Sequence, residues 1–269
     1  MGRKDGRYVD DAFAVQREPV FTRDHVFALA AGNLAAVVVP SFLDAGTCIG
    51  AMEAISRLPV KDVNAKRVPD RVTRFGPSLH DYRSVRGDFE ADAYWEAADT
   101  ARSLWAAARV SPDPVRLAID RISAGWGSPI KPATINGRSL FSGMFRDVNF
   151  GIRIHFDEIT QEYPRGLFDQ ELAAQLSFNL WVQVPRVGGA TTIWRRRWHP
   201  QDYQFRDGYA VHSTIIDGFP DASFKPRAGD AALFNSGYMH AVEDCHGDRR
   251  VAFSFFLGLT ESNELIAWA

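Results

Sequence analysis

The sequence predicts a mainly β protein with a helical flank, whose core is a double-stranded β-helix (jelly roll) or another β-sandwich buttressed by helices. Helical patterns dominate the first half of the chain, and after Trp126 the pattern changes to short alternating strands. Short strands separated by Gly and Pro turns are typical of sandwiches and jelly rolls. We expect one domain over 1–269, with a mostly helical flank at 1–128 and a β core at 129–269 that carries the site.

The flank begins with a β-branched strand at 35–39, which Pro40 ends. Asp44 is a good N-cap for a helix that continues to about Leu58. The polar run from Pro59 to Glu90 has no clear period, so we expect a loop with short strands there.

Two longer helices follow in the flank. Asp92–Arg109 places apolar residues at the spacing of one helical face, with Asp92 as its cap. Asp113–Ala124 has a second apolar face, and Gly125 is expected to end it. Both helices are expected to pack against one sheet of the core.

The β core is predicted from alternating apolar residues and from turn signals such as Asn136-Gly137. The predicted strands are Ser139–Val148, Gly151–Phe156, Ala174–Val184, Ala190–Trp198, Gly208–Ile216, Ala231–Phe234 and Arg250–Gly258. The stretch from Gly229 to Phe256 is interpreted as two strands joined by a turn.

Composition argues against several functional classes. Hydrophobic residues make up 46% of the chain, which is enough for a large core and argues against intrinsic disorder. The formal net charge of −2 argues against general affinity for nucleic acid or anionic membranes. Cys48 and Cys245 are too few for a disulfide framework, so we expect reduced thiols. No secretory signal or membrane-spanning run is visible, which favours a cytoplasmic protein. The sequence leaves open whether it is a monomer or a homodimer.

A candidate metal site lies in the second half of the chain. His155 and Asp157 are two apart in a strand-like run, so they point to the same face of an extended chain. With His240 they would form a set of two imidazoles and one carboxylate. Such a set leaves several metal positions open and is typical of non-haem Fe(II) oxygenases. Zinc in a hydrolytic site is an alternative metal for the same set.

The basic residue that accompanies this site is predicted from strand alternation. Arg250, Ala252 and Ser254 share one face of the last predicted strand, while Arg249 points to the other. A guanidinium and a hydroxyl on one face can bind a single carboxylate. His246 competes with His240 as the second imidazole, but it is too close to Arg250 for that arrangement.

With these residues in place, the chain resembles the Fe(II)- and 2-oxoglutarate-dependent oxygenases. Their jelly-roll, cupin-like core carries His-x-Asp, a distant His and a basic residue about ten positions later, and His155, Asp157, His240 and Arg250 fill those places. The resemblance covers roughly 140–260 and includes a Gly-Gly turn at Gly188-Gly189.

The resemblance implies a metal site, a cosubstrate site and a reaction. The triad would bind Fe(II) and be the catalytic centre, 2-oxoglutarate and O₂ would be cosubstrates, and Arg250, Ser254 and Val242 would hold 2-oxoglutarate. Halogenating relatives lack the carboxylate so that chloride can bind the iron, whereas Asp157 is present here. The expected reaction is therefore hydroxylation of an unactivated C–H bond, releasing succinate and CO₂, with desaturation or ring formation as variants.

The substrate is expected to be a small molecule, such as an amino acid derivative or a secondary metabolite. Candidate contacts are Arg146 and Arg153 on the strands that lead to His155, together with Tyr163 and Trp194. One inward-facing arginine of Arg195-Arg196-Arg197 could also bind an acidic group. The loop 158–171 could be a lid over the metal. A protein or peptide hydroxylase and a non-catalytic jelly-roll binding protein are the alternative functions.

Overall fold

Strand β12 (Leu172–Gln183) is the centre of the fold, and its two faces differ in character. Leu176, Phe178 and Leu180 pack into the main hydrophobic cluster on one face, while Ser177 and Asn179 on the other face line an internal chamber. This period of two follows from the pleat of a strand. The computed structural model describes residues 2–4, 7–9, 12–62 and 72–269.

The larger of two facing sheets contains β12 and its neighbours. Antiparallel partners of β12 are β18 (Ala231–Asn235) and β21 (Val251–Thr260). The path of this sheet is β3 (Val15–Arg17), β4 (Ala36–Val39), β18, β12, β21, β10 (Met144–Val148), β6 (Val72–Phe75) and β5 (Lys61–Asp62), and β22 (Leu265–Trp268) joins β21 to β7 (Lys131–Pro132).

The smaller sheet carries the candidate metal ligands. Its order is β11 (Ile152–His155), β19 (Tyr238–Val242), β14 (Thr191–Arg197) and β17 (Asp221–Phe224). A second hydrophobic cluster lies between the sheets and includes Trp181, Ile193, Phe234 and Ala252. Two facing, mainly antiparallel sheets make the double-stranded β-helix that the sequence predicts, and helices cover its outer face. The predicted fold class is confirmed.

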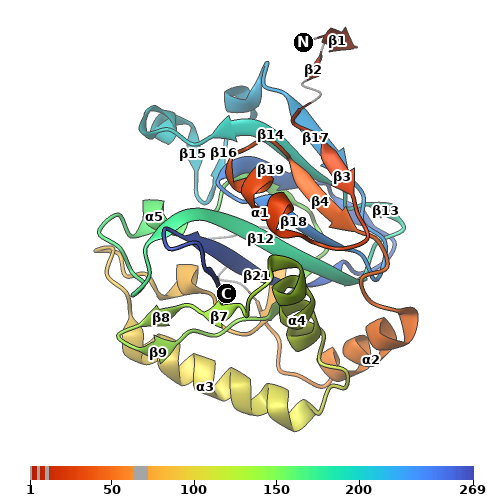
Figure 1. Ribbon diagram of the computed structural model, residues 1–269, viewed down its shortest axis with the longest axis vertical. Coiled ribbons are helices and arrows are strands. Elements are labelled where there is room, and N and C mark those ends of the chain that lie inside the picture. Colours follow the sequence, from red (N-terminus) through yellow and green to blue (C-terminus); the bar gives the residue numbers. More distant parts are fainter. Residues whose placement is uncertain (1, 5–6, 10–11, 63–71) are drawn as a thin grey trace.

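Four longer helices contribute to the main cluster: α1 (Arg23–Ala30), α2 (Ala45–Ile55), α3 (Ala91–Ala108) and α4 (Pro114–Trp126). Figure 1 shows α2, α3 and α4 gathered on one side of β12 and β21, with β14, β17 and β19 on the other side. Asp44 caps α2 as predicted, with its carboxylate accepting the Thr47 N–H at 2.8 Å. The helices thus cover the outside of the larger sheet and leave the space between the sheets for the site.

The other described elements are short and connect these layers. They are β1 (Gly2–Lys4), β2 (Arg7–Val9), β8 (Thr134–Ile135), β9 (Arg138–Ser139), α5 (Ile159–Glu162), β13 (Val187–Gly188), β15 (Arg206–Asp207), β16 (Ala210–Val211), β20 (Cys245–His246) and the 3₁₀ helices η1 (Leu79–Tyr82), η2 (Pro200–Phe205) and η3 (Ser213–Ile216). Asn136-Gly137 joins β8 to β9 with two positive φ angles, which confirms the predicted turn. None of the described helices is long and apolar enough to span a bilayer.

Several predicted boundaries were wrong. Helix α4 runs through Gly125 and ends at Gly127, whose φ of 88° supplies the left-handed cap. Helix α3 begins after Glu90, so Asp92 lies in its first turn and is not its cap. The predicted strand Gly208–Ile216 is only the two-residue β16 followed by η3, because His212 caps that 3₁₀ turn. Within the predicted loop 59–90, residues 63–71 lie outside the described part.

Two larger corrections concern the architecture. The stretch 229–256 contains three principal strands, not two, because β19 follows β18 and crosses to the smaller sheet. In the flank 1–128, β3 is a strand of the larger sheet that was not predicted, whereas β4 confirms the predicted strand at 35–39 and β5 and β6 lie in the run predicted to contain short strands. Cys48 and Cys245 are both free, as expected, and the structure shows that both are also buried.

Candidate metal centre

The two imidazoles meet because β11 and β19 pair. His155 and His240 are opposite residues in this antiparallel pair, and their ring centroids are 4.2 Å apart. A register irregularity between Ile152 and His155 adjusts the strand just before the first ligand. Both side chains are buried, at 7% and 4% exposure. The sheet therefore fixes the spacing of these two side chains without help from a ligand.

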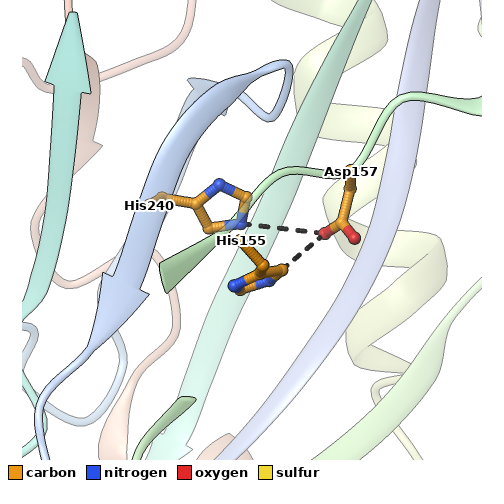
Figure 2. A group of neighbouring side chains, drawn as sticks. All are labelled: His155, Asp157 and His240. Atoms are coloured by element: carbon orange, nitrogen blue, oxygen red, sulfur yellow. Dashed lines mark ion pairs between the residues drawn. The ribbon is translucent and has the colours of Figure 1, made fainter. Parts of the chain in front are cut away.

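Asp157 follows the end of β11, and backbone contacts hold it beside the imidazoles. Its N–H donates to the Ser236 carbonyl at 2.8 Å, and its carbonyl accepts from Ser236 Oγ at 2.9 Å and Gln175 Nε2 at 3.1 Å. Its Oδ2 lies 3.7 Å from Nε2 of both His155 and His240. Figure 2 shows the three side chains converging from β11, β19 and the segment after β11.

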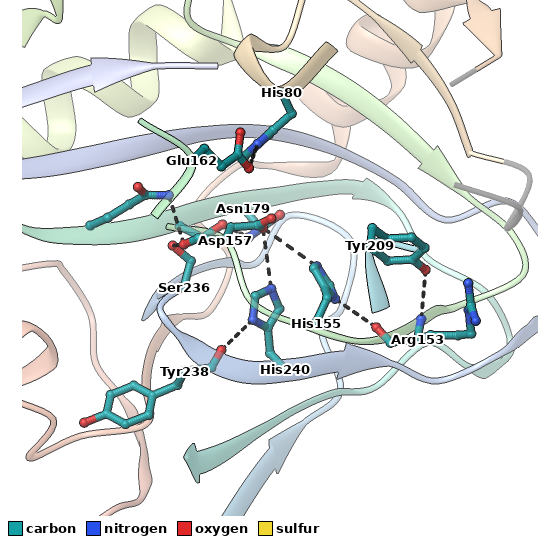
Figure 3. A network of polar contacts seen from close by, with 12 residues as sticks. His80, Arg153, His155, Asp157, Glu162, Asn179, Tyr209, Ser236, Tyr238 and His240 are labelled. Atoms are coloured by element: carbon teal, nitrogen blue, oxygen red, sulfur yellow. Dashed lines mark hydrogen bonds and ion pairs between the residues drawn. The ribbon is translucent and has the colours of Figure 1, made fainter. Parts of the chain in front are cut away.

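Hydrogen bonds orient both imidazoles in the same way. Nδ1 of His155 lies 2.8 Å from the Arg153 carbonyl, and Nδ1 of His240 lies 2.9 Å from the Tyr238 carbonyl (Figure 3). A carbonyl can only accept, so each Nδ1 carries the proton and each Nε2 keeps its lone pair. Backbone carbonyls commonly orient metal-binding histidines in this manner.

Burial and neighbouring charge set the ionisation of the triad. Burial, and then the nearby His240, lower the pKa of His155 to about 4, so its imidazole is neutral at pH 7. Burial raises the pKa of Asp157, but the surrounding imidazoles, His155 first, lower it further, so it lies below its ordinary value. A neutral imidazole at His155 and an ionised carboxylate at Asp157 are the protonation states that metal binding requires of these two residues. One ligand atom from each residue lies within 4.8 Å of the others.

An inner chamber of about 40 Å³ extends from the triad between the sheets. Arg250 lines it, is 5% exposed and stacks over the Trp181 ring at 5.5 Å. Burial lowers the pKa of Arg250 to about 10, so the guanidinium is charged at pH 7. Its Nη2 lies 3.4 Å from Thr191 Oγ1, and it forms no ion pair with a described carboxylate. A buried cation in this state favours an anionic ligand.

Three buried side-chain polar atoms also lack hydrogen-bond partners among the described residues: Arg250 Nε, Trp181 Nε1 and Ser254 Oγ. Ser254 lies two positions beyond Ala252 on the same face of β21, as the predicted alternation required. Val242 lines the chamber from β19. His246, the competing imidazole, lies on β20 opposite Val187 and is exposed, away from the chamber.

An outer cleft of about 460 Å³ opens on the other side of the triad. Most of the polar side chains that line this cleft were not identified from the sequence. They come from separate elements: Arg74 on β6, His80 and Asp81 on η1, Glu162 on α5, and Arg206 and Tyr209 in and after β15. His80 Nδ1 lies 2.5 Å from Glu162 Oε1. Burial lowers the pKa of His80, but Glu162 outweighs that effect and raises it. Figure 3 shows this pair close to Asp157.

The four predicted substrate contacts lie in different environments. Arg146 lines both the chamber and the cleft. Arg153 instead bonds Asp207 at 2.7 Å and lies over the Tyr209 ring at 5.3 Å. Tyr163 is 7% exposed and packs within the main cluster, where its ring centroid is 6.5 Å from that of Phe89. Trp194 packs near Met239 in a third cluster. The geometry therefore supports Arg146 and argues against Tyr163 and Trp194.

The three consecutive arginines have partners outside the cleft. Arg196 Nη2 lies 2.7 Å from both carboxylate oxygens of Asp202, and Arg197 lies 3.1 Å from Glu158. Arg195 lies over the Phe13 ring at 5.7 Å.

In the loop 158–171, helix α5 is tied to Gln175, whose Oε1 accepts the Ile159 N–H at 2.9 Å. Closure of this loop over the metal stays a prediction.

Comparison with known proteins places this site in a family. The sequence profile of the carrier-protein-independent halogenase WelO5 matches residues 24–268. The chain belongs to the WelO5 family. It is also 43% identical over 258 residues to L-γ-glutamyl-L-propargylglycine hydroxylase of Streptantibioticus cattleyicolor, covering 96% of each protein. The expected oxygenase relationship is thereby confirmed, and this WelO5-family member is an enzyme.

Solved structures agree with the fold. An N-substituted L-amino acid dioxygenase from Burkholderia ambifaria, in complex with α-ketoglutarate, has a TM-score of 0.61 and 16% identity, covering 92% of this chain and 91% of that one. HygX from Streptomyces hygroscopicus, with nickel and 2-oxoglutarate bound, has a TM-score of 0.51 and 14% identity, covering 89% and 87%. At these identities the likeness shows the shared jelly-roll fold.

Proposed function

We propose that this WelO5-family member is an Fe(II)- and 2-oxoglutarate-dependent dioxygenase that hydroxylates an unactivated C–H bond of a small amino acid derivative. The observation that carries the proposal is a complete set of two imidazoles and one carboxylate beside a buried arginine that has no counter-ion among the described residues. Its 43% identical relative is a hydroxylase named for a γ-glutamyl amino acid. The cleft volume falls within the range of ordinary small-molecule sites.

The residues present fit both the metal and 2-oxoglutarate. His155, Asp157 and His240 would hold Fe(II), since imidazole and carboxylate are its usual ligands in such oxygenases. Arg250 would bind the distal carboxylate of 2-oxoglutarate, with Ser254 Oγ and Trp181 Nε1 as further donors without partners among the described residues. When bound, iron and 2-oxoglutarate reduce O₂, so that substrate C–H, O₂ and 2-oxoglutarate give C–OH, succinate and CO₂.

The protein's own contribution is positioning and charge. Ser236 and Gln175 hold the backbone of Asp157, so the carboxylate does not have to be ordered when metal binds. The Trp181 ring supports the Arg250 guanidinium from one side. Arg153 bonds the wall residue Tyr209 through its N–H, which donates to the phenol oxygen at 3.2 Å. These contacts restrict the site before any ligand enters.

Asp157 favours hydroxylation over halogenation. The family profile takes its description from a halogenase, and the sequence resemblance implies that halogenating relatives lack the carboxylate. In this chain the Asp157 carboxylate faces both Nε2 atoms at equal distances, so it would take the position that chloride needs. Desaturation and ring formation use the same ligand set, and product analysis distinguishes them from hydroxylation.

We also propose that 1–269 acts as one domain. Strands from the flank and from the β core share the larger sheet, and all four longer helices contribute to one hydrophobic cluster with β12 and β21. A cytoplasmic location and either a monomer or a homodimer stay predictions.

The decisive test is an anaerobic titration of the apoprotein with Fe(II) and 2-oxoglutarate, recorded as the visible charge-transfer band of the chelate. We expect the band in the wild type and its loss in Asp157→Ala and His240→Ala. His246→Ala is the matched control and should retain the band, because His246 is exposed and remote from the chamber. A folded wild type without the band would refute the oxygenase mechanism and leave a binding protein or a zinc site.

A further inference from the structure

We propose that Arg146, with Arg74 beside it, binds a free carboxylate of the substrate in the outer cleft. The inference rests on the proposed function and adds the chemical class of the substrate: a carboxylic acid, not an ester or a carrier-bound thioester. It follows from the pairing of β10 with β6 and from the charges of the cleft.

Arg146 and Arg74 are directly opposite each other in the antiparallel pair of β10 and β6. Both line the outer cleft. Like charges opposite each other on neighbouring strands destabilise a sheet, unless an anion lies between or beside them. Arg74 has such a partner, because it forms an ion pair with Asp81. The side chain of Arg146 forms neither a hydrogen bond nor an ion pair with any described residue.

The acidic groups of the cleft are already engaged. Asp81 pairs with Arg74, and Glu162 pairs with His80. Asp157 is the remaining acidic residue of the described cleft wall, and it faces the two imidazoles. Burial lowers the pKa of Arg146, while Asp157 counteracts this effect. A divalent ion bound to Asp157 would cancel that attraction, so the loaded enzyme has a half-buried guanidinium that needs another anion.

The position of Arg146 favours an anion from the substrate. Arg250 already supplies a cation deep in the inner chamber, whereas Arg146 is also exposed to the larger outer cleft beside Asp157. A guanidinium binds a carboxylate through two parallel N–H···O bonds. An ester or thioester carries no negative charge, so it cannot form this charge-assisted pair. The carbon that reacts would then lie near the carboxylate of the same substrate molecule, as in an α-amino acid derivative.

The test compares an acid with its ester on the enzyme loaded anaerobically with Fe(II) and 2-oxoglutarate. The probes are L-γ-glutamyl-L-propargylglycine and its two mono-methyl esters, titrated calorimetrically and by the change in the chelate band. We expect the acid to bind about 10- to 100-fold more tightly than one ester, the range of a charged hydrogen-bonded pair. Arg146→Gln should abolish this preference and Arg146→Lys should retain part of it.

Two controls separate this site from the cosubstrate site. Arg146→Gln should bind Fe(II) and 2-oxoglutarate as the wild type does, whereas Arg250→Gln should lose the chelate. Arg206→Gln removes an exposed arginine from the same cleft and should keep the preference for the acid. Loss of the chelate in Arg146→Gln would assign Arg146 to 2-oxoglutarate and overturn the proposal. Absence of the chelate in the wild type would instead refute the proposed function.

The apoprotein gives an independent measurement. Because burial outweighs the attraction between Asp157 and the Arg146 guanidinium, Arg146→Gln should be at least as stable to thermal unfolding as the wild type. A lower midpoint in this variant would show that Arg146 stabilises the fold, and the proposal would fail. Equal binding of the acid and both esters by the wild type, or binding of none of them, would also overturn it.

Discussion

His155 and His240 are opposite residues in the pair of β11 and β19, and each donates its Nδ1–H to the carbonyl two residues before it. The repeated arrangement directs both Nε2 atoms toward Asp157. Strand pairing and local hydrogen bonds therefore position the side chains of the ligand set.

Gln175 is predicted to be a positioning residue for the metal. Its amide bridges the Asp157 carbonyl and the Ile159 N–H from a buried position on β12. We expect Gln175→Leu to weaken Fe(II) binding by about 10- to 100-fold, as for other residues that orient metal ligands. The measurement is the Fe(II) dissociation constant with 2-oxoglutarate present. Gln183→Leu, at the far end of the same strand, is the control and should bind Fe(II) normally.

Trp181 is predicted to contribute to 2-oxoglutarate binding through its N–H. Its indole nitrogen is buried without a described partner, and its ring lies under Arg250. Trp181→Phe keeps an aromatic ring at this position and removes the N–H donor, so we expect about tenfold weaker 2-oxoglutarate binding, the effect of one hydrogen bond to a charged group. Trp194→Phe, in the third cluster, should leave the affinity unchanged. Equal affinities in all three proteins would exclude a role for the Trp181 N–H.

The stability of the apoprotein should fall between pH 6.5 and pH 4. His155 has an ordinary pKa of 6.5 when unfolded and about 4 when folded, so the unfolded state binds the extra proton in this range. The folded state therefore loses stability as the pH falls, by an amount on the order of 3 kcal/mol at the lower end. Chemical unfolding of wild type and His155→Gln across this range measures it. A variant with the same pH dependence as the wild type would contradict the assignment to His155.

Alanine substitutions at Gly125 and Gly127 should each lower the free energy of unfolding, for different reasons. A Cβ at Gly125 would lie 1.8 Å from the Phe21 carbonyl oxygen, so Gly125→Ala must displace backbone although alanine favours helices. Gly127 has open space around it but a φ of 88°, for which an L-residue costs roughly 1–2 kcal/mol. We expect Gly125→Ala to lower the free energy of unfolding by more than Gly127→Ala does. Denaturant titrations decide, and the reverse order would mean that α4 moves freely away from Phe21.

The sequence was informative wherever a pattern is local. Alternation along 250–254 correctly placed Arg250, Ala252 and Ser254 on one face, because strand geometry needs only a period of two: Arg250 and Ala252 line the chamber, and Ser254 is opposite Asn179, which also lines it. Asp44 and Asn136-Gly137 were identified from their own chemistry as a helix cap and a turn. His155-x-Asp157, a distant His240 and Arg250 indicated the oxygenase family, which the comparisons confirm.

Tertiary structure decided what depends on pairing between distant segments. A glycine at 125 suggested a helix end, but the helix continues past it. Gly125 instead leaves room for the Phe21 carbonyl, and Gly127 is the C-cap of α4. His240 lies on β19, a strand of the smaller sheet, although the preceding strand β18 belongs to the larger sheet. Local periodicity does not encode this change of sheet. His80, Glu162 and the opposed Arg74 and Arg146 meet only when β6, η1, α5 and β10 assemble around the triad. Local sequence thus determined the ligand types, whereas long-range register determined which charges surround them.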